Sequence, residues 1–257
     1  MAYSLKEILS LSLDVGERML KCGGEVSRVE ETVNIICHAY GVEFREVFVI
    51  NSLIVATLRK DEESVTESRR ITHLSRDLNQ LEKLNNLSRE ICKKHVSRDE
   101  VLKRINSYKK PKYLTVLIGQ VLAAVSFTLF FKGNVLDGVV SFIIALALFG
   151  IDYLVRNKEM NQLIMNFIES FIIGIMAIML CKIGIGTHKE SIMIGCIMLL
   201  IPGLAMFTSV NDMFKGDTVS GATRFIEGLF SSLVIAAGIG CALLLGGVLW
   251  LIYYMHL

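Results

Sequence analysis

The sequence predicts a membrane α-helical protein in which five transmembrane helices are preceded by a small cytoplasmic α+β domain. Of its 257 residues, 53% are hydrophobic, against about 45–50% in soluble domains even with glycine counted, and the mean hydropathy is +0.52. Residues 113–257 hold only 7 of the 27 Lys and Arg residues and 8 of the 25 Asp and Glu residues. We therefore divide the chain into a cytoplasmic domain at 1–110 and a transmembrane domain at 111–257.

Helical and strand patterns alternate within the N-terminal domain, which we call the head. Apolar residues recur at helical spacing until Gly23 and Gly24, which end a helix because glycine accepts the left-handed cap conformation. Two runs rich in β-branched and aromatic residues flank a turn at Asn51 and Ser52, which predicts a hairpin. A weaker strand signal follows, and helical spacing then returns twice. The expected helices are 3–21, 25–40, 77–95 and 98–107, and the expected strands are 42–50, 53–58 and 65–71.

Five apolar runs follow the head, and each is long enough to cross a bilayer, for which about 20 residues are needed. A basic stretch at 103–112 lies directly before the first run, and Lys and Arg clustered beside a span mark the cytoplasmic side. This places the N-terminus in the cytoplasm and the C-terminus outside, in a multi-pass protein of the plasma membrane. The runs cover residues 113–131, 135–155, 163–181, 191–210 and 225–251.

Several function classes lack their sequence signals. The six cysteines contain no CxxC pair, no His or Cys spacing suggests a metal, and no P-loop or dinucleotide fingerprint is present. No nucleophile lies in a pattern with a base, and no basic stripe with interleaved aromatic residues points to nucleic acid. We expect no enzyme, no cofactor, no bound metal and no nucleic-acid partner.

The segment between residues 201 and 227 is the first candidate for function. Pro202 beside Gly203 lies inside the fourth apolar run, where proline removes a backbone donor and kinks or breaks a helix. Either this is a packing kink followed by a plain polar loop, or it is a discontinuous helix and gate beside a substrate path. The candidate transport and gating residues are Pro202, Gly203, Asn211, Asp212, Gly216, Asp217, Ser220, Gly221, Arg224 and Glu227.

An acid inside the third run is the second candidate. Glu169 lies about six residues, or roughly 9 Å, into the run, where a carboxylate is costly unless it faces a bundle interior or water. It is either a proton-coupling acid or a neutral group hydrogen-bonded to Asn166 or Ser170. Asp152 is a further coupling candidate, although its spacing of four residues before Arg156 favours an interfacial ion pair.

Small residues and the number of spans point to association. Gly238, Ala242 and Gly246 recur every four residues in the last run, which lets another helix approach closely, from this chain or a partner. Many transporters consist of two repeated halves, so five spans could form one half that needs a second copy or a second chain. We expect an oligomer in the lipid bilayer.

Two ordered patterns of residues lie in the head and near the fourth run. In the head, the pattern is Gly16, Arg18, Gly23, Gly24, Glu25, Arg28 and Glu30. Near the fourth run, it is Pro202-Gly203, Asn211-Asp212, Gly216-Asp217, Ser220-Gly221 and Arg224. With these patterns the chain resembles the threonine/serine exporter family. A weaker match to the same family is Phe131-Lys132-Gly133 with Asp137, where Asp137 is expected to cap a helix at the first external turn.

This resemblance implies a secondary exporter of threonine and serine or, in related two-component systems, of a dicarboxylate such as succinate. In full-length members a second set of hydrophobic helices follows the first. With five spans, this chain resembles the larger component of a split system, which needs a small multi-span membrane subunit as partner. Two other classes stay open: a membrane-anchored regulator whose head binds a ligand, and a membrane enzyme with its activity in residues 1–110.

Overall fold

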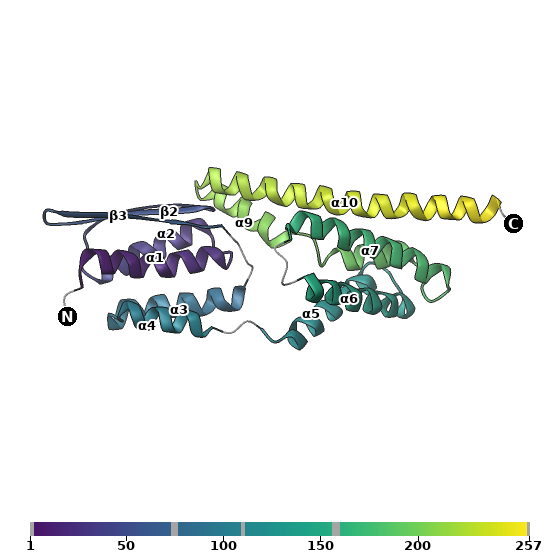
Figure 1. The fold of residues 1–257 in the computed structure, drawn as a ribbon, viewed down its shortest axis with the longest axis horizontal. Helices are drawn as coiled ribbons and strands as arrows, with labels where there is room; N and C mark the ends of the chain where they lie inside the picture. The colour runs from purple at the N-terminus through teal and green to yellow at the C-terminus, as the bar shows by residue number, and fades with distance from the viewer. Residues whose placement is uncertain (1–2, 73–76, 109–110, 156–159, 256–257) are drawn as a thin grey trace. The chain divides into compact units, whose positions relative to one another are not determined.

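The computed structural model describes residues 3–72, 77–108, 111–155 and 160–255, with side chains described up to residue 247 (Figure 1). The chain forms two compact units. The first contains Met1–Lys110 and Ala205–Phe225, and the second contains Pro111–Leu204 and Ile226–Leu257. The head therefore packs as one unit with a segment that belongs to the apolar half of the sequence.

Two helices begin the first unit. Helix α1 (Leu5–Lys21) starts with a capping box between Ser4 and Glu7, which satisfies backbone donors of its first turn. Gly23, at φ +88°, turns the chain into α2 (Val26–Ala39). A Cβ at Gly16 would lie 2.7 Å from a methyl of Val33, so glycine is needed where α1 meets α2.

The sheet of the first unit is antiparallel, with the order β1-β2-β3. Strands β1 (Phe44–Ile50), β2 (Leu53–Lys60) and β3 (Glu63–Arg70) include the predicted hairpin and third strand. The register pairs Ile50 with Leu53, which leaves Asn51 and Ser52 as the turn. Alternate residues of β2, namely Ile54, Ala56 and Leu58, are fully buried.

Two more helices, α3 (Leu78–Lys94) and α4 (Arg98–Ser107), complete the head. Figure 1 shows the layers of this unit, with the sheet on one side of α1 and α2 and with α3 and α4 on the other. The core between the layers is apolar and includes Leu9, Leu20, Ile36 and Ile91.

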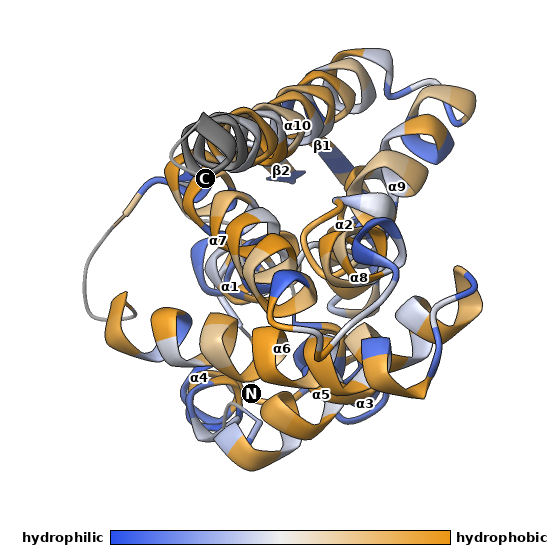
Figure 2. Ribbon diagram, turned by 90° about the vertical axis from the view of Figure 1, so that its right-hand side faces the viewer, coloured by the Kyte–Doolittle hydropathy of each residue, from blue (hydrophilic) through white to orange (hydrophobic). Residues whose placement is uncertain are grey.

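The second unit is helical, and its longest elements suit a membrane. Helices α5 (Tyr113–Phe130), α6 (Val135–Val155), α7 (Gln162–Lys182) and α10 (Thr218–Met255) are each long and apolar enough to span one. Figure 2 shows hydrophobic residues along all four. Among the described residues only these four helices qualify, so the expected count of five spans is not confirmed.

The difference lies in the fourth apolar run, which is interrupted. Helix α8 (Lys189–Ile197) and helix α9 (Gly203–Phe214) are both too short to span alone. Pro202 stands between them, as expected for a residue that lacks a backbone donor and restricts the residue before it. Helix α9 also continues beyond residue 210, and α10 begins at Thr218 instead of 225, so the loop between them is short.

Candidate functional site

The corner between α9 and α10 lies in the first unit and brings the second sequence pattern together. Gly216, at φ +96°, allows the turn between the two helices. A Cβ at Gly221 would lie 2.6 Å from the carbonyl oxygen of Ser209, so only glycine permits this approach of α10 to α9. The tight corner places Asp212 of α9 beside Arg224 of α10.

Arg224 and Asp212 form a buried ion pair. Arg224 Nη1 lies 3.2 Å from Asp212 Oδ2, and the two residues are 8% and 0% exposed. The second oxygen, Asp212 Oδ1, is buried without a hydrogen-bond partner among the described residues. Burial raises the pKa of Asp212, while the charge of Arg224 acts in the opposite direction. Such a pair is costly to bury and strongly destabilising to break on one side only.

The head supplies the remaining partner of the arginine. Arg224 Nη2 donates to Asn51 Oδ1 at 2.7 Å, and Asn51 Nδ2 donates to the carbonyl of Ser220 at 2.8 Å. The sequence identified Asn51 only as a turn residue. Its role depends on contacts with residues that lie 169 and 173 positions away in the sequence. No local sequence pattern predicts such contacts.

Acids of the head pattern meet the same corner. Lys215 Nζ lies 2.6 Å from Glu25 Oε2. On the next turn of α2, burial and the neighbouring charge of Asp217 raise the pKa of Glu30. The two sequence patterns, almost 200 residues apart, thus form one charged cluster, which we call the corner cluster: Glu25, Glu30, Asn51, Asp212, Lys215, Asp217 and Arg224.

Other residues of the two patterns lie outside this cluster. Gly16 and Gly23 shape the α1–α2 packing and turn, Arg18 faces the Gln80 amide, and Arg28 is exposed on α2. Glu227, the last of the candidate gating residues, is exposed. In the second pattern, Pro202 and Ser220 are buried, Gly203 is exposed, and Asn211 is half-buried.

A separate polar group lies within the apolar second unit. Glu169 on α7 is only 5% exposed, and the carboxyl group of Asp152 on α6 interacts with it. A hydrogen bond between two carboxyl groups requires a proton on one of them. The arginine predicted to pair with Asp152, Arg156, lies outside the described residues.

The amide and hydroxyl suggested as partners of Glu169 are engaged elsewhere. Asn166 Nδ2 donates to Ser231 Oγ on α10 at 2.6 Å, and Ser170 Oγ donates to the carbonyl of Phe167 at 3.0 Å. Among the described residues, Asp152 is therefore the side chain that interacts with Glu169.

Small residues join α7 to α10 within the second unit. A Cβ at Gly238 would lie 2.0 Å from Ser170 Oγ, and one at Gly246 would lie 2.8 Å from the side chain of Ile178. Ala242 lies against Gly174, where an added Cβ would be 2.5 Å away. The ridge predicted on the last run therefore packs against a helix of the same chain.

Asp137 joins two turns of the second unit. Its carboxylate accepts a hydrogen bond from the backbone N–H of Asn134, as expected for a helix cap. It also accepts bonds from the N–H groups of Thr187 and His188, at 2.7 and 3.0 Å, and from the ring of His188 at 2.8 Å. The residue is fully buried, so these donors compensate its charge.

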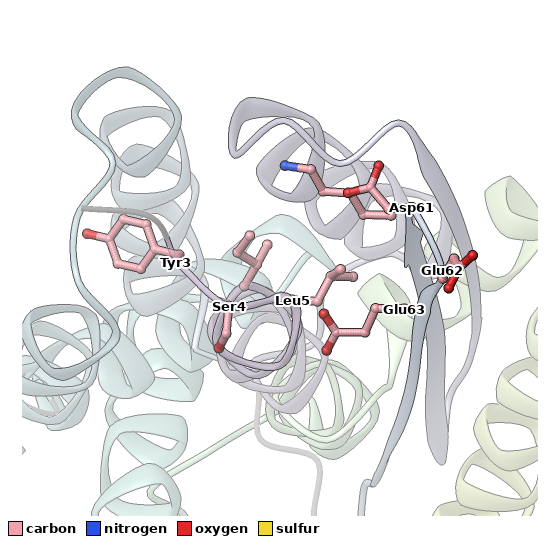
Figure 3. Close-up of a pocket in the computed structure, with 8 residues that line it drawn as sticks. Tyr3, Ser4, Leu5, Asp61, Glu62 and Glu63 are labelled. Carbon is pink, nitrogen blue, oxygen red and sulfur yellow. The ribbon is translucent and has the colours of Figure 1, made fainter.

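An open hollow of about 380 Å³ lies on the head, away from the predicted site residues (Figure 3). The N-terminus of α1 and the β2–β3 turn form it, with Tyr3 and Leu5 on one side and Asp61, Glu62 and Glu63 on the other. Across the residues described, no group of His, Cys, Asp and Glu side chains is arranged to hold a metal.

A family model described as "Putative threonine/serine exporter" matches residues 10–246. The chain belongs to the threonine/serine exporter family. In this member of the family, part of each of the two patterns meets at the corner cluster. Its four long apolar helices are those of a membrane protein.

Two curated relatives of this family member match it nearly end to end. A Klebsiella aerogenes protein named "Probable succinate transporter subunit YjjP" is 23% identical over 247 residues, which cover 94% of this chain and 95% of the relative. An Escherichia coli protein of the same name is 21% identical over 248 residues, with 94% and 96% covered. No solved structure matches the chain significantly.

Proposed function

We propose that this exporter-family protein is the larger subunit of a two-component secondary exporter in the plasma membrane, and that its first substrates are threonine and serine. The observation that carries the proposal is the corner cluster, where the two patterns of the family resemblance meet around the buried Arg224–Asp212 pair. The word "subunit" in the relatives' names supports a partner, which we take to be a small multi-span membrane protein.

The corner cluster acts as a gate at the cytoplasmic mouth of the path. Asp212, Asp217 and Arg224 form the charged gate, and the interruption at Pro202 and Gly203 lets α9 move relative to α8. Discontinuous helices near a transport site are typical of secondary transporters, in which alternating access moves one part against another. The head, residues 1–110, lies in the cytoplasm in this account, because the basic stretch at 103–112 precedes α5.

The Glu169–Asp152 pair couples export to a gradient. A carboxyl group can take up or release a proton, and either event changes the charge of the pair. Intramembrane acids that face each other inside a bundle commonly mark proton paths. The pair lies on α6 and α7, and Asn166 links α7 to Ser231 of α10.

The charges of the gate favour an amino acid. A zwitterionic α-amino acid carries a carboxylate and an ammonium group, and the gate offers both Arg224 and the unpartnered Asp212 Oδ1. A dicarboxylate would bring like charge to that oxygen. Succinate remains the second candidate, because both relatives are named as probable succinate transporter subunits.

An efflux measurement tests this function. Cells that lack the chain are loaded with a threonine- or serine-containing dipeptide, and external amino acid is followed with this chain, its partner, both or neither restored. We expect efflux only with both present. Efflux of succinate alone under the same design would replace the amino acids with the second candidate. No efflux of either, with both proteins detected in the membrane, would contradict the exporter and favour a ligand-binding regulator.

A further inference from the structure

Among the described residues, two side chains of the head form hydrogen bonds or ion pairs with the segment 205–225. Asn51 comes from the β1–β2 turn and Glu25 from the start of α2. Both contacts reach the corner that carries Asp212 and Arg224. The head therefore contacts the gate residues directly, which its sequence alone does not predict.

Asn51 is chemically suited to hold the arginine. A carboxamide has both a donor and an acceptor, and Asn51 uses its oxygen for Arg224 and its nitrogen for the carbonyl of Ser220. The two contacted residues lie one helical turn apart on α10, so the amide fixes both the guanidinium and the backbone beside it. A carboxylate or a hydroxyl at this position cannot make the same two bonds in the same orientation.

The turn that carries Asn51 is itself held in place. Its flanking residues Ile50 and Leu53 pair in the β1–β2 ladder, and the following Ile54 is fully buried between the sheet and the helices. The backbone N–H of Ile71 also donates to the carbonyl of Ser52 at 2.8 Å. The amide is therefore presented by a rigid element of the head, as a positioning group requires.

We propose that the head is a clamp for the gate, and that Asn51 is the positioning residue which holds Arg224 on Asp212 in the closed state. This inference rests on the proposed function, because it assigns a role within export. Substrate does not need to touch Asn51. Opening the gate requires Arg224 to leave the amide, and closing restores the bond.

The second contact is built to release. Lys215 and Glu25 keep 43% and 26% of their side chains exposed, and ion pairs in such positions contribute little to stability. Asp217 also brings a like charge to Glu30 of α2. The clamp thus combines one buried, directional contact with a solvated ion pair, which together hold the corner without locking it.

Asn51→Ala tests the positioning role in the full chain with its partner. Without the amide, the closed gate loses a hydrogen bond to a charged group. Export keeps the ratio of internal to external substrate low, and we expect this ratio to rise by about tenfold in the variant. Downhill flux should persist, and the apparent KM should change less than the maximal rate. Asn51→Asp keeps the acceptor for Arg224 but loses the donor to Ser220, and should fall between. Ser52→Ala, at the exposed neighbour in the same turn, should match the wild type.

A reversible cross-link tests the opening. Glu25→Cys and Lys215→Cys are combined and joined by a short bis-methanethiosulfonate reagent, which a reductant cleaves. We expect the joined chain to stop exporting and to recover after reduction. Each single variant is modified at its one introduced cysteine but is not joined, and should continue to export. Full export by the joined chain would overturn the clamp. A wild type that exports neither amino acid nor succinate would instead contradict the proposed function, and cross-link formation would still show whether the head and the corner are close.

Discussion

The two units differ in the chemistry that they expose. In the first unit the largest buried side chains are apolar, such as Leu9 and Leu58, which have no exposed surface. In the second unit large apolar side chains such as Leu244 are 73% exposed, while Thr128 and Ser141 are buried and hydrogen-bonded at 2.6 Å. Water drives apolar groups inward in the head, whereas lipid is as apolar as leucine and leaves polar contacts and close packing to join helices.

Truncating the arginine of the corner cluster should have the largest effect. Arg224→Ala leaves Asp212 as an uncompensated buried charge, for which a loss of about 3–5 kcal/mol is expected. Limited proteolysis of the purified chain along a urea gradient would measure it, and export should be lost. Glu227→Ala, at an exposed position three residues further on α10, is the matched control. Equal stability of the two variants would show that the ion pair does not stabilise the folded chain.

The contrast between the units can be tested with the same substitution in each. Leu9→Ala opens a cavity in the head core and should destabilise the first unit by about 2–5 kcal/mol. Leu244→Ala removes a side chain that faces outward and should stay within about 0.5 kcal/mol in detergent micelles. Thermal unfolding of both variants measures the difference. A large loss for Leu244→Ala would show that this face is covered by protein instead of lipid.

Glycines two positions apart on α10 sharpen the packing argument. An added methyl at Gly238 meets Ser170 and the backbone of Phe167, so Gly238→Ala should cost about 1–3 kcal/mol. Gly240 has open space around it, and Gly240→Ala should stabilise the helix by up to about 1 kcal/mol. The two melting temperatures in detergent should therefore move in opposite directions. Stabilisation by both variants would exclude the close α7–α10 contact.

A smaller effect is expected from pH at the head. The pKa of Glu30 is raised above its ordinary 4.5, first by burial and then by Asp217. The folded state therefore favours the protonated acid, and stability is lost as pH rises from the unfolded pKa through the folded one. Glu30→Gln should be more stable than the wild type near about pH 7, with the gain fading towards pH 4.5. A series of melting temperatures at different pH measures this, with Glu31→Gln at an exposed neighbour as the matched control.

Elements with local signals could be predicted from the sequence. Helical spacing placed α1 closely, the lengths of the apolar runs placed α5 and α6, and the turn at Asn51 and Ser52 marked the hairpin. The interruption of the fourth run could be predicted from Pro202. Proline has no backbone N–H, so it removes a helical hydrogen bond regardless of its tertiary surroundings. The same run was nevertheless predicted as one span, because its residues stay apolar on both sides of the break. Composition alone does not show that the helix is interrupted.

Contacts between distant segments could not be predicted in the same way. Asn51 gave only a turn signal, yet it bonds Arg224 across 173 residues. Asp152 gave no signal for a partner on another helix, yet it interacts with Glu169 of α7. Spacing along one helix is readable from sequence, but the rotation and depth of neighbouring helices are set by packing, here by glycines such as Gly221.

The carboxyl pair of the second unit gives the most direct test of gradient-driven export. This chain and its partner, reconstituted in proteoliposomes, are given an imposed pH gradient, and the export rate of wild type is compared with that of Glu169→Gln. The glutamine keeps the size of the side chain but cannot give up a proton to Asp152. We predict that the gradient accelerates the wild type and leaves the folded variant unchanged. The same acceleration in both proteins would contradict the account.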